Sequence, residues 1–372
     1  MAVPSTLTDP YGALLTTTLR RVEPMLRDQI TRSNKFLAWL DMRGRMRGQD
    51  GGERVGVPLM YELNDTADIY SGYGLLNTTP QEGMTMAWYE WCQYAVSITI
   101  SRKEERQNSG RSQAINLLRA KTTQAMNSLK ELVNNSIVAG RITSGASSSN
   151  GEFSARVGDL DSGATGCLPL TALIDADEDR SRTDIGNINP ATWGFWQNRV
   201  KSSSATTFAA LKQEMQNLYN TCSRGTMGSP DLMLGTQVSW EQYWNSLQQQ
   251  ERYFITRPQV VDVLGGSEAL AFRQAAFVWD EVVPDVETTG TLLDGGIGLS
   301  SGDLQSDTIF FINTESMEWV YDTQTNFITT PMVRPDNQDA RTGQILYMGI
   351  MGTNHRRKNG VMKGIQHAAL TS

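Results

Sequence analysis

The first fifty residues place apolar side chains at the spacing of a one-sided helix. Pro24 interrupts this pattern, and because proline lacks the amide N–H of a continuous helix, two helical pieces fit as well as one. Residues 1–50 are therefore predicted to form a helical arm. The apolar positions recur every three or four residues and are followed by a second cluster: Leu14, Leu15, Leu19, Val22, Leu26 and Ile30, then Phe36, Leu37, Trp39 and Leu40.

Residues 51–105 change to the alternating pattern of β-strands and predict a long hairpin. The candidate strands are residues 55–63 and 84–101. The connection between them, residues 64–83, has about twenty residues, whereas hairpin loops usually have two to five. An ordered loop of this length is usually functional. Its apolar side chains need a partner to cover them, which makes them candidates for a contact between subunits: Ile69, Tyr70, Tyr73, Leu75 and Leu76.

Residues 111–140 predict the longest helix of the chain. Apolar or small side chains recur there at three- and four-residue spacing, from Ile115 to Ser136. At about 1.5 Å per residue, a helix of about thirty residues would measure about 45 Å. This is longer than the helices that a compact domain usually contains.

The rest of the chain predicts a mixed region that follows a flexible Ser/Gly link at residues 144–151. The stretch 283–307 is rich in Gly, Ser and Thr and predicts a long hairpin or surface loop. The overall class is therefore α+β. Helices are expected at 206–223 and 238–250, and strands at 231–235, 277–281, 308–313, 317–321, 327–330 and 345–351.

The composition supports an ordered globular protein. The 372 residues are 39% hydrophobic and 20% charged, and this length suggests two to three domains. The sequence contains no apolar run of about 18 residues, which predicts no membrane-spanning helix. The polar N-terminus does not resemble a secretory signal.

The net charge of −7 is unevenly distributed. Residues 1–50 and 334–372 are both net basic, while the middle of the chain is acidic. Arg43, Arg45 and Arg47 occupy alternate positions in the arm. Such a cluster can face nucleic acid or an acidic partner surface, although three arginines alone are more often a solvated strand face.

The few cysteines and histidines leave little room for catalytic or metal chemistry. Cys92, Cys167 and Cys222 are far apart and odd in number, which indicates neither a zinc cluster nor a disulfide framework. Cys92 is most simply a small packing residue. His355 and His367 are the only imidazoles, and His355 stands beside three cations, as surface histidines often do.

The acidic run at 175–179 begins like a calcium-binding loop. Asp175, Asp177 and Asp179 match its first positions, but Arg180 stands where glycine is required and Gly186 where glutamate is required. An exposed acidic loop is therefore favoured. Phosphate-loop, nucleophile-elbow and zinc-protease motifs are also absent from the sequence. We accordingly expect no enzyme activity, no cofactor and no metal, and we assign the nine tryptophans to core or subunit interfaces.

A basic arm, an apolar-tipped hairpin and a long helix imply assembly with copies of the same chain. The order of these parts resembles the major capsid protein of tailed bacteriophages, the Hong Kong-type coat fold. The similarity is good over about residues 10–250. The segments that carry it are NKFLAWL (34–40) with Gly51-Gly52 and VPLMYE (57–62), YSGY (70–73), WCQYAVSITIS (91–101), EERQNSG (104–110) and NINPATWGFWQNR (187–199).

The resemblance implies a division of the chain into five parts. Residues 1–50 would be the N-terminal arm, and 51–105 the extended loop, which lies over the neighbouring subunit. Residues 106–149 would form the peripheral domain with its spine helix, 150–325 the axial domain, and 326–372 the return to the peripheral domain. Some relatives join subunits through a loop lysine, but this chain has no lysine between Gly51 and Arg102, so that crosslink is not expected.

The resemblance also implies a function and partners. Hexamers and pentamers of the chain would form the icosahedral head shell of the virion around double-stranded DNA, assembled in the host cytoplasm, with scaffolding, portal and decoration proteins as further partners and no membrane. Ile69, Tyr70, Tyr73, Leu75, Leu76 and Trp39 are the interface candidates, and Arg43, Arg45 and Arg47 face the nucleic acid or a neighbouring subunit. The alternative is a bacterial nanocompartment shell, similar to encapsulin, that encloses a cargo enzyme.

Overall fold

The structure, a computed structural model, describes residues 35–107, 117–138, 168–175, 185–225, 228–247, 269–280, 282–283, 307–334 and 338–365. They divide into two compact units. Unit 1 comprises the described parts of Val96–Ser128 and Thr329–Ile345, and unit 2 comprises those of Arg32–Ala95, Leu129–Ile328 and Leu346–Ser372.

A six-stranded sheet forms the centre of unit 2, in the order β5-β13-β9-β6-β8-β7. β6 is buried at every position, as expected for a strand with neighbours on both sides. β13 pairs with β5, and β6 with β8, in parallel, while β6–β9, β9–β13 and β7–β8 are antiparallel. The bounds are β5 Arg199–Ser202, β6 Leu232–Gly235, β7 Leu270–Phe272, β8 Ala275–Trp279, β9 Asp307–Ile312 and β13 Gly360–Ile365.

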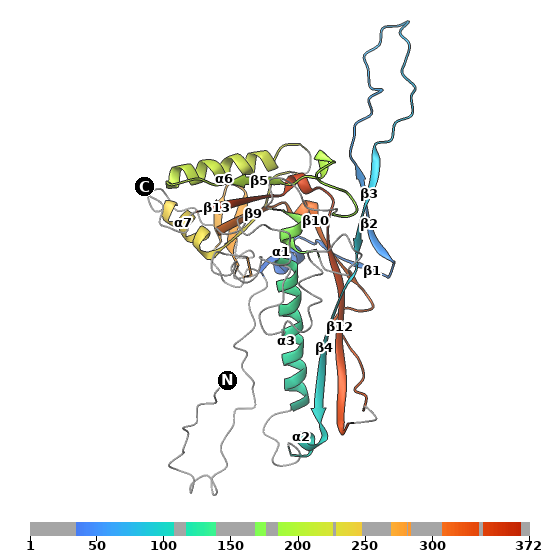
Figure 1. Cartoon of the computed structure of the whole chain (residues 1–372), viewed down its shortest axis with the longest axis vertical. Coiled ribbons are helices and arrows are strands. Elements are labelled where there is room, and N and C mark those ends of the chain that lie inside the picture. Colours follow the sequence, from blue (N-terminus) through green and yellow to red (C-terminus); the bar gives the residue numbers. More distant parts are fainter. Residues whose placement is uncertain are drawn as a thin grey trace. The chain divides into compact units, whose positions relative to one another are not determined.

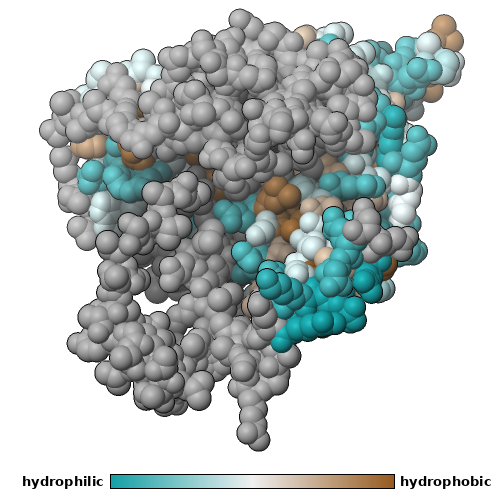
Figure 2. Space-filling view, turned by 60° about the horizontal axis from the view of Figure 1, so that its bottom comes forward, coloured by the Kyte–Doolittle hydropathy of each residue, from teal (hydrophilic) through white to brown (hydrophobic). Residues whose placement is uncertain are grey.

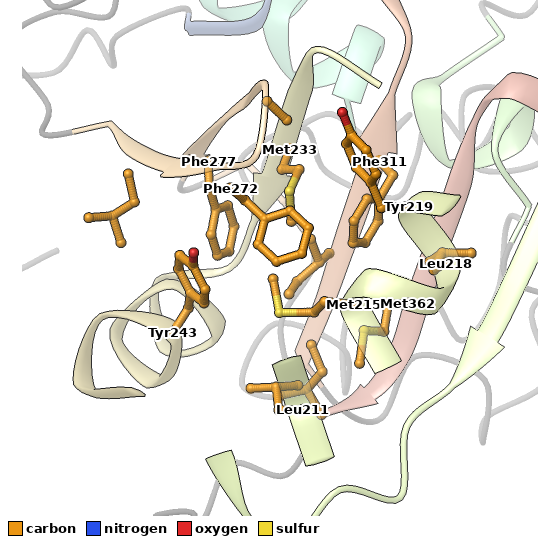
Figure 3. Close-up of a cluster of buried hydrophobic side chains, with 14 of the residues drawn as sticks. Leu211, Met215, Leu218, Tyr219, Met233, Tyr243, Phe272, Phe277, Phe311 and Met362 are labelled. Carbon is orange, nitrogen blue, oxygen red and sulfur yellow. The ribbon is translucent and has the colours of Figure 1, made fainter. Parts of the chain in front are cut away.

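Helices α6 (Phe208–Cys222) and α7 (Gln237–Leu247) pack against this sheet. Thr207 begins α6 by accepting a hydrogen bond from the Ala210 amide, which satisfies one of the free N–H groups of the first turn. Apolar side chains at helical spacing then point at the strands, as Figure 3 shows for Leu211, Met215, Leu218 and Tyr219 of α6 and Tyr243 of α7 against Met233, Phe277 and Phe311.

The second sheet has the order β1-β10-β12-β11, and β4 also pairs with β12. β1 follows α1 directly and runs parallel to β10, with Met46 opposite Trp319. Tyr347 of β12 accepts a hydrogen bond from the Trp319 indole at 2.7 Å, and the two rings stack. The bounds are α1 Lys35–Met42, β1 Met46–Gln49, β4 Cys92–Ser101, β10 Met317–Asp322, β11 Ile328–Thr329 and β12 Ala340–Thr353.

The predicted hairpin is present, but its second strand is shorter than expected. β2 (Arg54–Met60) and β3 (Met84–Glu90) are antiparallel, with Val55 opposite Tyr89 and Met60 opposite Met84. The single return strand predicted over 84–101 is wrong, because the chain leaves the hairpin at Trp91 and continues as β4 in another sheet. The Trp91 indole donates a 2.8 Å hydrogen bond to the Gly52 carbonyl, which joins this bend to the start of the hairpin.

Unit 1 contains α2 (Arg102–Gln107) and the first half of α3 (Leu117–Val138), which continues into unit 2. The predicted helix over 111–140 is thus confirmed from 117 to 138, and its remaining residues lie outside the described ones. Lys121 donates hydrogen bonds to the Glu104 carboxylate at 2.9 Å and the Thr99 carbonyl at 3.2 Å, so α3 is tied to α2 and β4 within this unit. None of the described helices has the length and apolar character needed to cross a membrane.

The cysteines correct one sequence-based expectation. Cys92 is disulfide-bonded, although the spacing of the cysteines indicated no disulfide. Sequence separation does not report spatial separation, so a bond between distant positions could not be predicted. Cys222 at the end of α6 is a free, fully buried thiol.

Burial predicts that Cys222 is chemically inert. It raises the pKa of the Cys222 thiol from 9.0 to about 12, so the reactive thiolate is scarce in the folded chain. Because the unfolded thiol ionises first, the stability due to this shift is complete below pH 9 and is lost as the pH rises towards 12. We expect maleimide to label Cys222 at least about a hundredfold more slowly in native than in urea-unfolded protein, measured by peptide mass spectrometry. Equal rates would contradict this burial.

Candidate subunit-contact hairpin and its anchor

The loop that connects β2 and β3 exposes the apolar side chains that the sequence singled out. Ile69 is 98% exposed, Tyr73 105% and Leu75 100%, while Tyr70 and Leu76 are also exposed. Figure 1 shows this loop continuing the ribbon of β2 and β3. Figure 2 shows hydrophobic residues beside hydrophilic ones on the described surface. Neighbouring exposed side chains of this size are typical of an interaction surface.

Side-chain turns and bonds between its two ends give this loop a defined path. The carboxamide oxygen of Asn64 accepts hydrogen bonds from the Thr66 amide and hydroxyl at 2.9 and 2.6 Å, which is an Asx turn. Asn77 and Thr79 repeat the arrangement at 3.1 and 2.6 Å. At the start of the loop, Tyr61 donates from its amide to the Gly83 carbonyl at 3.0 Å and from its hydroxyl to the Glu82 carbonyl at 2.8 Å.

The β2–β3 ribbon has one buried and one exposed apolar face. Val55, Leu59, Ala87 and Tyr89 are buried, and Tyr89 donates a 2.7 Å hydrogen bond to the Thr353 carbonyl. Burial raises the pKa of this phenol well above its ordinary value. The opposite side, called here the outer face, is partly or fully exposed, and the Arg54–Glu90 ion pair at 3.1 Å closes the end of it that is farthest from the loop. The other residues of the outer face are Gly56, Pro58, Met60, Met84, Met86 and Trp88.

The ribbon is held by the segment 185–196, called here the anchor segment. The Tyr61 ring stacks on Phe195 at 5.3 Å between centroids and meets Trp193 edge-on at 5.7 Å. The Trp88 amide donates a 3.1 Å hydrogen bond to the Gly186 carbonyl. Gly186 has φ +66, and a Cβ there would lie 3.1 Å from the Ala87 side chain, so glycine permits this close approach.

A buried arginine fixes the anchor segment in turn. Arg356, in the short helix η5 (Arg356–Lys358), is 1% exposed. Its guanidinium donates to the carbonyls of Leu173 and Trp196 at 2.9 Å each, to the Ala172 carbonyl at 3.4 Å, and to the side-chain oxygen of Asn198 at 3.2 Å. It therefore joins the end of β12 to helix α5 (Leu170–Leu173) and to the short helix η3 (Gly194–Trp196). The Trp196 indole continues the connection by donating to the Ile185 carbonyl at 2.8 Å.

The aromatic contact at Tyr61 predicts how firmly the hairpin is held. Tyr61→Ala removes both ring contacts and the bond to Glu82, so we expect faster amide exchange in β2 and β3, by about tenfold or more. The six-stranded sheet should exchange as before. Tyr321→Ala, a half-buried tyrosine outside the hairpin, is the matched control. Unchanged exchange in β2 and β3 on Tyr61→Ala would show that this contact does not hold the ribbon.

The prediction that Trp39 lies at a subunit interface is not met, because the structure buries this side chain within its own chain. It is 2% exposed, in the middle of α1, and therefore offers almost no surface to a neighbouring chain. Lys35, at the start of the same helix, is also buried. Its ammonium group donates a 2.6 Å hydrogen bond to the Trp279 carbonyl and lies 4.1 Å from the centre of the Trp279 indole ring. The face of α1 that looked available from the sequence thus belongs to the core of unit 2.

The three arginines predicted to face nucleic acid are arranged along the end of α1 and β1. Arg43 lies 3.4 Å from the Asp231 carboxylate, with its guanidinium 5.0 Å from the centre of the Trp39 ring. Arg47 donates a 2.7 Å hydrogen bond to Glu318 on the adjacent strand β10. Arg45 is half-buried between them. Two of the three are thus partly neutralised by carboxylates of their own chain.

The other candidate groups are spread over different parts of the described structure. Asp175 is 5% exposed rather than part of an exposed acidic loop, while Asp177, Asp179 and His367 lie outside the described residues. In the described part of the chain, no three His, Cys, Asp or Glu side chains come together as metal ligands. His355 is half-buried, and burial, Lys358 and Arg357 hold its pKa below the ordinary value. The surface position expected for His355 is therefore only partly met, and its neighbours Arg356 and Lys358 are buried.

The anchor segment and Arg356 are the functional residues that sequence reasoning missed. The segment was noticed only as part of a resemblance, and Arg356 only as one of several cations beside His355. Lys358 shows the same behaviour, donating to the carbonyls of Arg224 and Gly228 at 3.1 Å each. A basic side chain that donates its hydrogen bonds mainly to backbone carbonyls cannot be recognised from the sequence, because every residue has a backbone carbonyl and no particular partner residue is required.

Taken together, the elements define the Hong Kong-type α+β fold of phage capsid subunits, which solved structures share over nearly the whole chain. The capsid asymmetric unit of Cyanophage A-1(L) matches with a TM-score of 0.58 and 12% identity, covering 94% of this chain and 98% of that chain. The capsid of Cyanophage P-SCSP1u matches with a TM-score of 0.53 and 11% sequence identity, and the match covers 97% of this chain and 96% of that chain. The SrpI encapsulin complex from Synechococcus elongatus PCC 7942 matches with a TM-score of 0.52 and 7% sequence identity, and the match covers 94% of this chain and 95% of that chain. No protein-family model matches the sequence, and no curated protein matches it significantly.

Proposed function

We propose that this chain is the major capsid protein of a tailed bacteriophage. Hexamers and pentamers of the chain form the icosahedral head shell of the virion, which encloses double-stranded DNA and is assembled in the host cytoplasm. The observation that carries the proposal is the fold, which covers 94% of this chain and 98% of a phage capsid subunit. The exposed apolar loop between β2 and β3 supports it, because such side chains need another molecule to cover them.

Each part of the chain has a role in this proposal. Residues 1–50 are the arm, 51–105 the extended loop, 106–149 the peripheral domain with the spine helix, 150–325 the axial domain, and 326–372 the return to the peripheral domain. Ile69, Tyr70, Tyr73, Leu75 and Leu76 contact a neighbouring subunit. Interlocked loops of this kind suit obligate interfaces, which often exceed about 2,000 Å².

Electron microscopy of the expressed full-length protein tests the proposal. The expected result is closed shells of uniform size that contain many copies of the chain. Small oligomers alone, under every salt and protein concentration tried, would contradict it. Scaffolding, portal and decoration proteins are further partners in the proposal, and co-expression with the genes that flank this one tests whether shell yield and uniformity increase.

The contact with packaged DNA is electrostatic and independent of sequence in this proposal. Arg43, Arg45 and Arg47 are its candidates, although Asp231 and Glu318 already neutralise part of their charge. Changing all three to glutamate should lower the length of packaged genome, measured by gel electrophoresis of DNA from purified heads. Arg224→Glu, a single exposed arginine elsewhere in unit 2, is the control. Unchanged assembly and unchanged genome length would remove these residues from the DNA-facing surface.

The second candidate function is a bacterial nanocompartment shell that encloses a cargo enzyme. The observation in its favour is the match to the SrpI encapsulin complex, which covers 94% of this chain. The two functions predict different contents for the same kind of shell. Nuclease-protected DNA inside native particles supports the capsid, and a stoichiometric internal protein without DNA supports the nanocompartment.

A further inference from the structure

The exposed sulfur atoms of the described chain gather on the outer face of the hairpin. Cys92 and Cys222 are fully buried, so the exposed sulfur belongs to methionine. Five described methionines are at most 1% exposed: Met215, Met233, Met317, Met351 and Met362. Five more are partly buried: Met42, Met46, Met126, Met332 and Met348. The exposed methionines of the described chain are Met60, Met84 and Met86, and all three lie on the outer face.

Two of these thioethers are open to small solutes. Met60 and Met84 stand directly opposite each other at the end of the β2–β3 pairing and are 74% and 81% exposed. Both line a hollow of about 440 Å³ where the two strands open into the loop. A molecule as small as hydrogen peroxide can therefore reach either side chain without any opening of the fold.

The third thioether is partly covered by an aromatic ring. A Cβ at Gly56 would lie 2.9 Å from the Met86 sulfur and 2.9 Å from a carbon of the Trp88 ring, so both side chains occupy the space above this glycine. Sulfur packs favourably against aromatic rings in this way. Met86 is 40% exposed, so we expect it to react more slowly than Met60 and Met84.

Oxidation changes the polarity of such a face. The sulfur lone pair attacks one oxygen of hydrogen peroxide, and a new S–O bond forms as the O–O bond breaks. The leaving hydroxide takes the proton of the transferred oxygen and becomes water, while the sulfur loses two electrons to the peroxide. The product is a sulfoxide, which is polar where the thioether was apolar. Burying its oxygen in a contact without a hydrogen-bond donor is unfavourable.

We propose that Met60, Met84 and Met86 form an oxidation site that controls assembly: peroxide converts them to sulfoxides in the free subunit, and a subunit oxidised there assembles only at a much higher concentration. The inference rests on the proposed shell function, because the outer face continues into the loop that contacts a neighbouring subunit in that proposal. The modification is reversible, since methionine sulfoxide reductases restore the thioether.

Peroxide treatment of the full-length subunit before assembly tests this site. Peptide mass spectrometry follows each methionine, and light scattering with electron microscopy measures assembly. Met60 and Met84 should be oxidised at least about tenfold faster than the buried Met215 and Met233. The protein concentration needed for assembly should rise by about tenfold or more. Reductases for both sulfoxide epimers should then return it to the ordinary value.

A variant that cannot be oxidised at the outer face separates this site from other effects of peroxide. Met60→Leu with Met84→Leu and Met86→Leu keeps apolar side chains of similar volume, so it should assemble like the unaltered chain both before and after peroxide. The matched control carries leucine at three partly buried methionines: Met42, Met126 and Met348. This control should stay as sensitive to peroxide as the unaltered chain. Circular dichroism before and after treatment verifies that each protein remains folded.

The outcomes distinguish the oxidation site from the shell function. If the untreated chain forms shells and still forms them normally with Met60 and Met84 oxidised, the oxidation site is overturned while the shell function stands. The same holds if the outer-face variant loses assembly to peroxide as fully as the unaltered chain. Recovery with the reductases needs no substitution, and its failure after the thioethers are restored would also overturn the site. If the untreated, unaltered chain forms no shells, the shell function itself fails.

Discussion

Arg356→Met should lower the free energy of unfolding by about 4 kcal/mol or more, the largest effect expected of a single change here. The substitution leaves the carbonyls of Ala172, Leu173 and Trp196 and the Asn198 side-chain oxygen without their donor. Each buried acceptor left unsatisfied costs about 1–3 kcal/mol. Methionine has a similar aliphatic length, so most of the loss comes from the missing hydrogen bonds.

The adjacent arginine provides the matched control for this prediction. Arg357 is exposed, and Arg357→Met should change the stability by less than about 0.5 kcal/mol. Urea unfolding followed by tryptophan fluorescence measures both variants, and amide exchange shows where the loss occurs. The anchor segment should lose protection first, followed by β2 and β3, which it holds. Equal stability of the two variants would mean that the guanidinium does not join these segments.

Replacing three apolar residues of the loop, Ile69, Tyr73 and Leu75, by serine should abolish shell assembly without destabilising the subunit. All three are almost fully exposed in the single chain, so the free energy of unfolding should change by less than about 0.5 kcal/mol. In an assembled shell, burial of each apolar side chain would contribute about 1.5–3 kcal/mol to the subunit contact, and the change to serine removes this contribution. The protein concentration needed for assembly should therefore rise by more than about a hundredfold.

Ser71→Ala with Thr78→Ala alters polar positions of the same loop and serves as the control. Light scattering during assembly and electron microscopy of the products measure the effect, and thermal unfolding verifies the subunit. The control should assemble at the ordinary concentration. Normal assembly by the serine variant would show that the loop tip is not a subunit contact, whereas a destabilised serine variant would show that the tip packs within its own chain.

Much of the fold was predictable because local patterns and the tertiary structure agree. The helix over 206–223 is confirmed as Phe208–Cys222, the strand over 231–235 as Leu232–Gly235, and the strand over 308–313 as Asp307–Ile312. In each, the spacing of the apolar residues matches the face that is buried. The exposed loop tip was predictable for a related reason, since apolar residues in a Gly- and Asn-rich stretch had no pattern that would bury them.

The remaining features depend on contacts that the sequence does not encode locally. β5, with the sequence RVKS, has no apolar alternation and is a strand because it pairs with β13 at the edge of the sheet. The return strand is divided at Trp91 because the residues before it pair with β2 and the residues after it pair with β12 in a different sheet. Trp39 was assigned to an interface because an amphipathic helix shows that one face is covered, but not whether the cover comes from the same chain.

The most direct test of the capsid proposal is a cryo-electron microscopy reconstruction of the particle that the full-length chain assembles. We predict a closed icosahedral shell in which Ile69, Tyr73 and Leu75 of every subunit are covered by another copy. A closed shell with this loop free in solvent would contradict the contacts assigned to it. The absence of any closed shell would contradict the capsid function.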